Sequence, residues 1–280
     1  MSTIVAWKLL LVPAFIGTLS LAGRRWGPAI SGWLIGLPVV AGPIVFFLAV
    51  EQGRSFASGA ARGTLTGLAS LSVYVLVYGR LSRRFGWIGS LLAGWCAFLL
   101  STVALERIPM PPLVPTFLAV SGIFLLVLRL LPEIGSLGDL PETPAWEIVA
   151  RMAAGAVLVV AITGAARSLG PRLCGLLTPF PVAATVFTVF THRFQGGAAA
   201  ARLLRGLVAG SFTLAVYFLI VAATLGPWGI PASFGAATAA CLVVHGASLH
   251  LMRAGSRPQK RPGGMTAPPG PEKLGNVPGR

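Results

Sequence analysis

Acidic residues are scarce in this chain, which has only seven Asp and Glu among 280 residues. Asp139 is the single aspartate, so no Ser-His-Asp set can be assembled, and no Gly-rich phosphate-binding motif is present. No carboxylate is central in a predicted helix, so coupling to sodium or protons has only Glu51 as a candidate. We therefore expect a protein that is not an enzyme and carries no cofactor.

Cysteine and histidine are also few and are not spaced as metal ligands. Cys96, Cys174 and Cys241 fall within apolar segments, with no paired spacing and no neighbouring His. His245 and His250 are five residues apart, whereas two His that bind one metal on a helix are four apart. We expect neither a disulfide nor a metal site.

Charged residues make up 10% of the chain, against roughly 25% in soluble domains. Hydrophobic residues make up 55%, the mean hydropathy is +0.82, and apolar runs of about 20 residues recur. Lipid offers no hydrogen-bond partner to the backbone, so these runs must be helices. The sequence predicts an all-α integral membrane protein with about nine crossings. The expected helices are 4–23, 28–51, 59–79, 86–105, 112–131, 147–166, 171–191, 200–222 and 229–251.

The formal net charge of +15 does not indicate nucleic-acid binding, because Lys and Arg sit at segment ends and in the tail instead of forming a soluble patch. The positive-inside rule explains them better. It predicts a bacterial inner-membrane protein with the N-terminus outside and the C-terminus in the cytoplasm. The Pro- and Gly-rich tail, 253–280, is expected to be disordered and to bind anionic lipid headgroups.

One pattern of residues occurs twice. Gly27-Pro28 recurs as Gly170-Pro171, 143 positions later, and the other matches keep this offset. They are Arg24 with Arg167, Gly32 with Gly175, Pro38 with Pro181, Gln52 with Gln195, Arg62 with Arg205 and Tyr74 with Tyr217. This indicates two copies of a four-helix unit. We divide the chain into repeat 1 (1–110), a connector helix and acidic loop (111–142), repeat 2 (143–252) and the tail.

The connector places an odd number of crossings between corresponding helices, so the second repeat is expected to be inverted. Inverted repeats are typical of transporters whose site lies at the bilayer midplane. Alternatively, the segments at 28–51 and 171–191 dip into the membrane and return at their prolines, which makes the repeats parallel. Their length of about 24 residues fits one tilted span better.

Prolines inside the corresponding helices are the first candidates for a substrate path. Pro38, Pro43, Pro179 and Pro181 remove backbone donors, which frees the carbonyls four residues earlier to bind a ligand. Gly32 and Gly175 allow close helix contact beside them. The alternative is that the prolines only kink helices for packing.

Paired polar side chains are the second set of candidates. Lys8 and Arg151 lie one turn inside matching helices, where they either reach the headgroups or line an anion path. Gln52 with Gln195 and Tyr74 with Tyr217 can hydrogen-bond a ligand without charge. A Tyr at a helix end is otherwise an interface anchor.

The run from Cys174 to Pro181, followed by Arg205-Gly206 and Tyr217, resembles the small GlpM-type bacterial membrane proteins, which are single repeats of comparable length. The resemblance covers the second repeat and, through the duplication, the first, where Gly36-Leu37-Pro38 departs from Pro179-Phe180-Pro181. Two inverted four-helix units joined by one helix are also similar in architecture to fused fluoride channels, although the Asn-bearing motif of those channels is not found.

These observations predict a membrane transporter or channel for a small anionic or amphiphilic substrate, with its path at the repeat interface. The alternative is a non-transporting scaffold for an envelope complex, in which Gly-rich faces dock helices and the basic tail recruits a partner. The lipid bilayer is a partner in either case.

Overall fold

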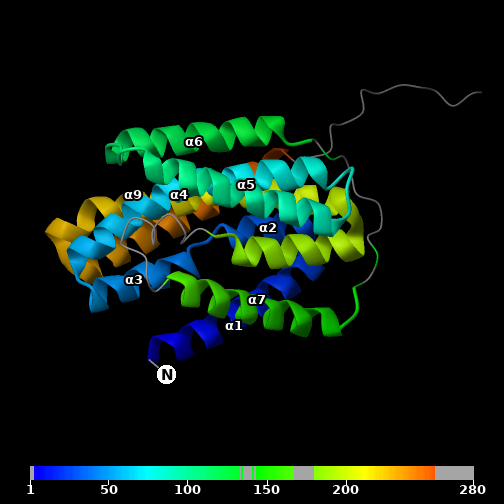
Figure 1. The fold of residues 1–280 in the computed structure, drawn as a ribbon, viewed down its shortest axis with the longest axis horizontal. Helices are drawn as coiled ribbons and strands as arrows, with labels where there is room; N and C mark the ends of the chain where they lie inside the picture. The colour runs from blue at the N-terminus through cyan, green and yellow to red at the C-terminus, as the bar shows by residue number, and fades with distance from the viewer. Residues whose placement is uncertain (1–2, 133, 135–140, 142, 167–179, 256–280) are drawn as a thin grey trace, which may run out of the picture.

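The helices of this protein run roughly along the long axis of the molecule (Figure 1). The computed structural model describes residues 3–132, 134, 141, 143–166 and 180–255. Every regular element within these ranges is a helix, which confirms the all-α class. The helices are α1 Thr3–Trp26, α2 Pro28–Ile35, α3 Ala41–Glu51, α4 Arg54–Leu81, α5 Trp87–Arg107, α6 Leu113–Leu130, α7 Trp146–Ala166 and α9 Val182–Gly255.

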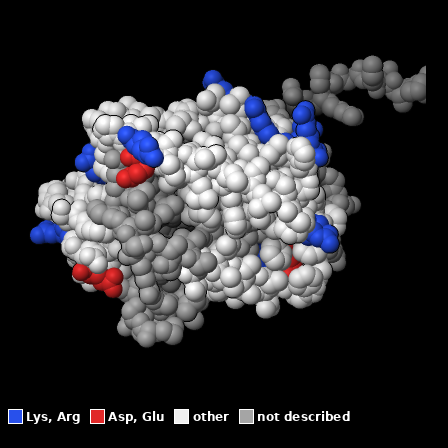
Figure 2. Space-filling model, viewed as in Figure 1, with Lys and Arg blue, Asp and Glu red and all other residues white. Residues whose placement is uncertain are grey.

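Four of the described helices are long and apolar enough to cross a membrane, namely α4, α5, α6 and the Val182–Ser248 part of α9. Large apolar side chains on them face outward: Leu100 on α5 is 71% exposed and Val243 on α9 is 70% exposed. Most charged side chains lie toward the two ends of the face seen in Figure 2, with uncharged surface between them. A soluble monomer rarely exposes so much contiguous apolar surface, so these features indicate a membrane protein.

Most predicted helices are confirmed. α1, α5, α6 and α7 begin and end within three residues of the predicted bounds. α4 begins at Arg54, five residues earlier than predicted. Residues 171–179 of the predicted helix 171–191 lie outside the described residues.

The prediction of one helix over 28–51 is wrong, because residues 36–40 are not helical. The last turn of α2 tightens: the N–H groups of Gly36 and Leu37 donate to the carbonyls of Trp33 and Leu34, each at 3.1 Å. Pro38 follows, and its ring lacks an N–H and disfavours a helical conformation at the residue before it. Helical structure resumes only at Ala41, so the interruption follows from the proline.

Two glycines divide α9 into three segments, 182–195, 197–228 and 230–255, which we call its first, second and third segments. Gly196 and Gly229 have φ of 87° and 76°, values that residues with a Cβ rarely adopt. Gly53, between α3 and α4, has φ 87° and ψ 166°, close to the 87° and 169° of Gly196. The predicted helices 200–222 and 229–251 correspond to the second and third segments.

The interrupted helix formed by α2 and α3 runs parallel to the second segment of α9 without turning back. Ala29 lies against Gly206, Gly36 lies against Gly210, and Gly42 lies against Tyr217. Because the contacts advance along both chains in the same direction, the alternative in which residues 28–51 dip in and return at their prolines is wrong.

Two other pairs of helices run antiparallel. The Arg54 guanidinium at the start of α4 donates to the Gly226 carbonyl, whereas Ser82, just after α4, donates to the Gly197 carbonyl at 3.1 Å. α4 therefore lies along the whole second segment of α9 in the opposite direction. α1 and α7 are opposed in the same way, since Gly17 lies against Met152 and Arg24 reaches Glu147.

Glycines let α2 and the second segment of α9 touch backbone to backbone. A Cβ added to Gly32 or Gly36 would overlap the backbone of Leu203 or Gly210, and a Cβ on Gly206 would overlap the Ala29 carbonyl. These glycines are buried or face the neighbouring helix, so no flexible side chain can give way. Pro38 causes the interruption at 36–40, and this close approach holds it against the second segment of α9.

Gly36→Ala is expected to destabilise the fold by about 1–3 kcal/mol or more, because the new methyl group forces the two backbones apart. Gly122→Ala on α6 is the matched control, since a Cβ there meets no heavy atom within 4 Å. Thermal unfolding of the purified protein in detergent checks this. Equal midpoints for the two variants would contradict the contact.

Candidate functional site

A pocket of about 70 Å³ lies where two non-helical stretches of the described chain meet. One stretch is the interruption between α2 and α3, and the other is Phe180-Pro181 before α9. We call this the central pocket. It is lined by Phe15, Ile35, Leu37, Val40, Ala41, Leu71, Phe180, Pro181, Val182, Ala183, Ala184, Leu207, Ser211 and Leu214.

Of the candidate prolines, Pro181 lines the central pocket, and Pro38 lies between the lining residues Leu37 and Val40. Pro38 lies within the interruption, and Pro181 directly precedes α9, where its carbonyl accepts the Thr185 N–H at 2.6 Å. Pro43 lies in the first turn of α3, so it does not break a helix interior as predicted. The prediction of a free Leu34 carbonyl is also wrong, since that carbonyl accepts the Leu37 N–H. Pro179 and Gly175 lie outside the described residues.

The side chains around the central pocket are almost entirely apolar. Ser211 carries the one polar side chain among the lining residues, and its hydroxyl donates to the Leu207 carbonyl at 2.8 Å. Pockets that enclose drug-sized ligands measure on the order of 300–1,000 Å³. In this conformation the central pocket therefore accommodates only a small, apolar part of a ligand.

Hydroxyl groups continue from one side of the central pocket along the first segment of α9. The Trp95 indole Nε1 donates to Thr185 Oγ1 at 3.1 Å, and the Thr185 hydroxyl donates to the Tyr74 oxygen at 3.3 Å. One turn further along α4, the Tyr78 hydroxyl lies 3.3 Å from His192 Nδ1. Both tyrosine side chains are fully buried, so the interpretation of Tyr74 as an interface anchor is wrong.

Tyr217 occupies the corresponding place on the second segment of α9. It is 5% exposed, and its hydroxyl lies against Gly42 at the start of α3. Gln52 and Gln195, in contrast, lie at the ends of α3 and of the first segment of α9, beside Gly53 and Gly196. The structure therefore places Tyr74 and Tyr217 in the interior and the two glutamines near the ends of the bundle.

Arg151 does not extend freely toward the headgroups. Its guanidinium donates to the Glu147 carboxylate at 2.5 and 3.1 Å, and both residues are buried. It also lies over the rings of Phe187 and Phe190, 4.9 and 5.5 Å from their centroids. Because Glu147 compensates its charge, Arg151 is not the free cation of an anion path. The Lys8 side chain lies outside the described side chains.

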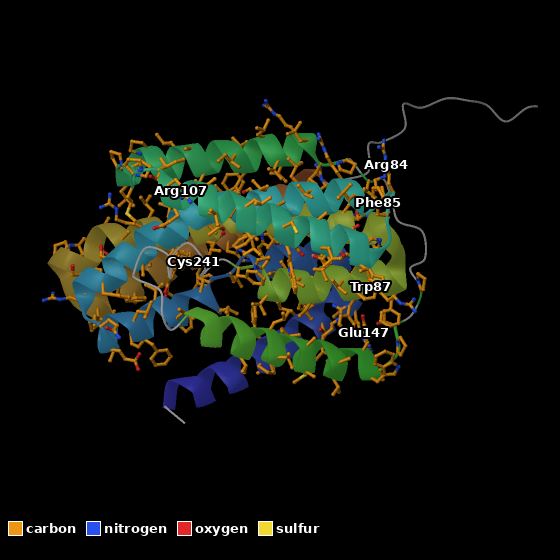
Figure 3. The ribbon with its side chains drawn as sticks, in the orientation of Figure 1. Arg84, Phe85, Trp87, Arg107, Glu147 and Cys241 are labelled. Carbon is orange, nitrogen blue, oxygen red and sulfur yellow. The ribbon has the colours of Figure 1, made fainter. Side chains whose placement is uncertain are left out.

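The sequence did not lead us to predict a structural role for Glu147. It also lies 3.6 Å from Arg24, which donates to the Pro144 carbonyl at 2.6 Å. Glu147, which Figure 3 labels, and the two arginines thus connect the end of α1 to the start of α7. The i, i+4 spacing of Glu147 and Arg151 in the sequence was the available signal.

His245 forms a second buried polar cluster. Its ring stacks on the Trp33 indole with centroids 3.7 Å apart, and its Nδ1 lies 3.2 Å from Thr213 Oγ1. Trp33 Nε1 donates to Ser248 at 2.8 Å. This cluster attaches the third segment of α9 to α2.

Another pocket, of about 130 Å³, lies at the link between α5 and α6. It is lined by Gly63, Thr66, Leu105, Ile108, Pro109, Met110 and Pro111. These residues belong to the end of the bundle and not to the interrupted helix. Within the described part of the chain, no three His, Cys, Asp or Glu side chains are grouped to hold a metal ion.

In comparisons with known proteins, no family model, no curated protein and no solved structure matched this chain. The geometry of the central pocket is therefore the basis for a functional proposal.

Glu147→Ala is expected to lower the free energy of unfolding by about 3–5 kcal/mol, because it leaves the Arg151 guanidinium buried without its carboxylate. Glu51→Ala, at an exposed position, serves as the control and should change little. The double variant Glu147→Leu/Arg151→Met should recover most of the loss, since it buries no charge. Reversible unfolding in mixed micelles measures all three, and a neutral Glu147→Ala would contradict the pairing.

Proposed function

We propose that this chain is a membrane transporter or channel with its substrate path between two inverted four-helix repeats. The repeats are 1–110 and 143–252, α6 connects them, and the chain crosses a bacterial inner membrane about nine times. The N-terminus is outside and the C-terminus is cytoplasmic. A duplicated GlpM-type unit is the origin that we propose for the two repeats.

Corresponding helices run in opposite directions, which supports inversion. α1 corresponds to α7, and α4 corresponds to the second segment of α9, each at the offset of 143 seen between Gly27 and Gly170. Both pairs are antiparallel in their contacts. Gly53 and Gly196, at the same offset, share one backbone conformation.

Contacts between the two proposed repeats occur in exchanged pairs, as a two-fold axis requires. Gly42 of the first repeat lies against Tyr217 of the second, and Thr185 of the second bonds Tyr74 of the first. Likewise, Arg54 reaches Gly226, and Gly197 lies against the backbone of Ser82 and Arg83. Chance packing of unrelated helices does not generate such exchanges.

The central pocket carries the proposal, because corresponding residues from both repeats line it. The pairs are Leu37 with Phe180, Val40 with Ala183, Ala41 with Ala184, and Leu71 with Leu214. The pocket thus lies on the pseudo-two-fold axis, beside the interrupted backbone. Transporters with inverted repeats bind their substrates at such positions.

The predicted substrates are small anionic or amphiphilic molecules. The central pocket favours an amphiphilic molecule over a small anion. The anionic preference rested on the basic pairs, but Glu147 compensates Arg151 and the described lining carries no charge. An apolar lining offers little to a small hydrated anion, whose desolvation costs several kcal/mol or more.

A non-transporting scaffold is the second candidate, and the Gly-mediated contact of α2 with α9 favours it. Close packing leaves a central pocket of only about 70 Å³. A scaffold would keep this packing permanently, whereas a transporter must open it.

Inversion predicts that the turns at Gly53 and Gly196 lie on opposite sides of the membrane. α4 has 28 residues, about 42 Å at 1.5 Å per residue, and it begins beside Gly53 and ends beside Gly197. In a variant without native cysteines, Ser55→Cys should react with an impermeant maleimide added outside. Arg193→Cys should react only after permeabilisation. Labelling of both from one side would contradict inversion.

Filling the central pocket should stop transport. Leu71→Trp and Leu214→Trp, at corresponding positions, are each expected to reduce substrate flux at least about tenfold, because the larger ring overfills the pocket. Leu92→Trp on α5, which is 55% exposed, is the control. Efflux from liposomes loaded with a panel of small anions, lipid phosphates and alkyl amphiphiles measures this. Wild-type flux no greater than that of empty liposomes would favour the scaffold.

A further inference from the structure

We infer that the substrate is an uncharged amphiphile, with its apolar chain in the central pocket and its hydrogen-bonding head on a line of hydroxyl groups beside it. This inference rests on the proposed transport function and defines its substrate class. We call the line of groups the hydroxyl track. It consists of Thr185, Thr188 and His192 on the first segment of α9, and Tyr74 and Tyr78 on α4.

The hydroxyl track forms because two helices present polar faces to each other. Thr185, Thr188 and His192 have the i, i+3, i+7 spacing of one helix face. Tyr74 and Tyr78 are one turn apart on α4, with ring centroids separated by 5.8 Å. Trp95 donates to Thr185, and Thr185 donates to Tyr74. One turn further along α4, Tyr78 contacts His192. These contacts place the polar groups in one row between α4 and the first segment of α9.

Thr188 is the member of the hydroxyl track whose hydroxyl is left for a ligand to bind. Its side chain is fully buried. Its Oγ1 lies close to the Tyr74 hydroxyl, but it meets the full geometry of a hydrogen bond with no described group. A buried hydroxyl without a partner is unfavourable, and Val, of the same shape, would avoid the cost. A ligand group that forms a hydrogen bond with Oγ1 explains why threonine occupies this position.

The hydroxyl track continues directly from the central pocket. Ala184 lines the pocket and Thr185 follows it, while Leu71 lines the pocket one turn before Tyr74 on α4. At its far end, half-buried His192 approaches the turn at Gly196. An amphiphile can therefore place the part of its chain nearest the head in the central pocket of about 70 Å³ while its head contacts the hydroxyls.

The track selects a head without charge. Its described hydrogen-bond and ring partners are Thr, Tyr, Trp and His side chains, and none is a permanent ion. Hydroxyls both donate and accept, so they suit an alcohol or amide head. A carboxylate or phosphate head would have no compensating cation among these described partners, which is costly for a buried charge.

The part of the track on α9 has no equivalent in the first repeat. The corresponding residues of the first repeat are Gly42, Val45 and Ala49, which lack hydroxyl groups. Tyr217, the counterpart of Tyr74, therefore lies against Gly42 where Tyr74 has Thr185. The threonine beside Tyr217 is Thr238 on the third segment of α9. The one-sided track gives the substrate a fixed orientation relative to the two repeats.

Thr188→Val tests this inference in the full chain reconstituted in liposomes. The probe is a long-chain alkanol carrying a photoreactive diazirine, compared with the matched fatty acid and alkyl phosphate. The alkanol should label the wild type saturably, and Thr188→Val should weaken its binding about fivefold to tenfold through loss of one hydrogen bond. Thr102→Val is the matched control, since its buried hydroxyl on α5 also lacks a partner but lies outside the track.

Both variants should melt at or above the wild-type temperature, because each removes a buried hydroxyl that has no well-formed hydrogen bond within the protein. Equal labelling of wild type and Thr188→Val, or tighter binding of the charged probes, would overturn the inference. The track would instead conduct protons if Thr188→Val altered the decay of a pH gradient across the liposomes and no alkanol labelling occurred. That result would also overturn the inference.

Saturable labelling without flux of any substrate supports the site and contradicts transport. Flux without alkanol labelling contradicts the inference alone.

Discussion

The close backbone contact between α2 and the second segment of α9 is the interaction on which the rest of the structure depends. Gly32 and Gly36 on one side and Gly206 and Gly210 on the other allow the two chains to touch. Side chains of any size would separate these helices and move the interruption at 36–40 away from Phe180-Pro181. The central pocket exists because this contact holds both stretches in place.

Lipid imposes a second constraint on the interruption. Non-helical backbone leaves polar groups without helical partners, so it is tolerated at membrane depth only when it is buried or lines a cavity. Here the interruption lies between α1, α4 and α9 and faces the central pocket, while α5, α6 and α7 expose apolar side chains outward. The pocket beside the interruption thus agrees with this constraint on non-helical backbone.

Apolar length and the spacing of Gly and Pro were enough to predict most helices and the turns at Gly53 and Gly196. They did not predict where the helix over 28–51 breaks, because Pro38 and Pro43 look alike in sequence and only Pro38 lies in the interruption. The partners of the charged and hydroxyl side chains could not be predicted either. Glu147 neutralises Arg151 locally, but Thr185 meets Tyr74 across a separation of 111 residues, which no spacing rule reveals.

The central claim is that the interrupted backbone lines a substrate path between the two proposed repeats, which a small dissolved reagent can therefore enter. The most direct test is the reactivity of Ala41→Cys and Ala184→Cys, at corresponding positions in the pocket wall, toward a hydrophilic thiol reagent in liposomes. Leu92→Cys, which faces outward on α5, sets the rate for a position in contact with lipid. The account predicts that both pocket cysteines react faster than this control. Rates no faster than that of Leu92→Cys would contradict it.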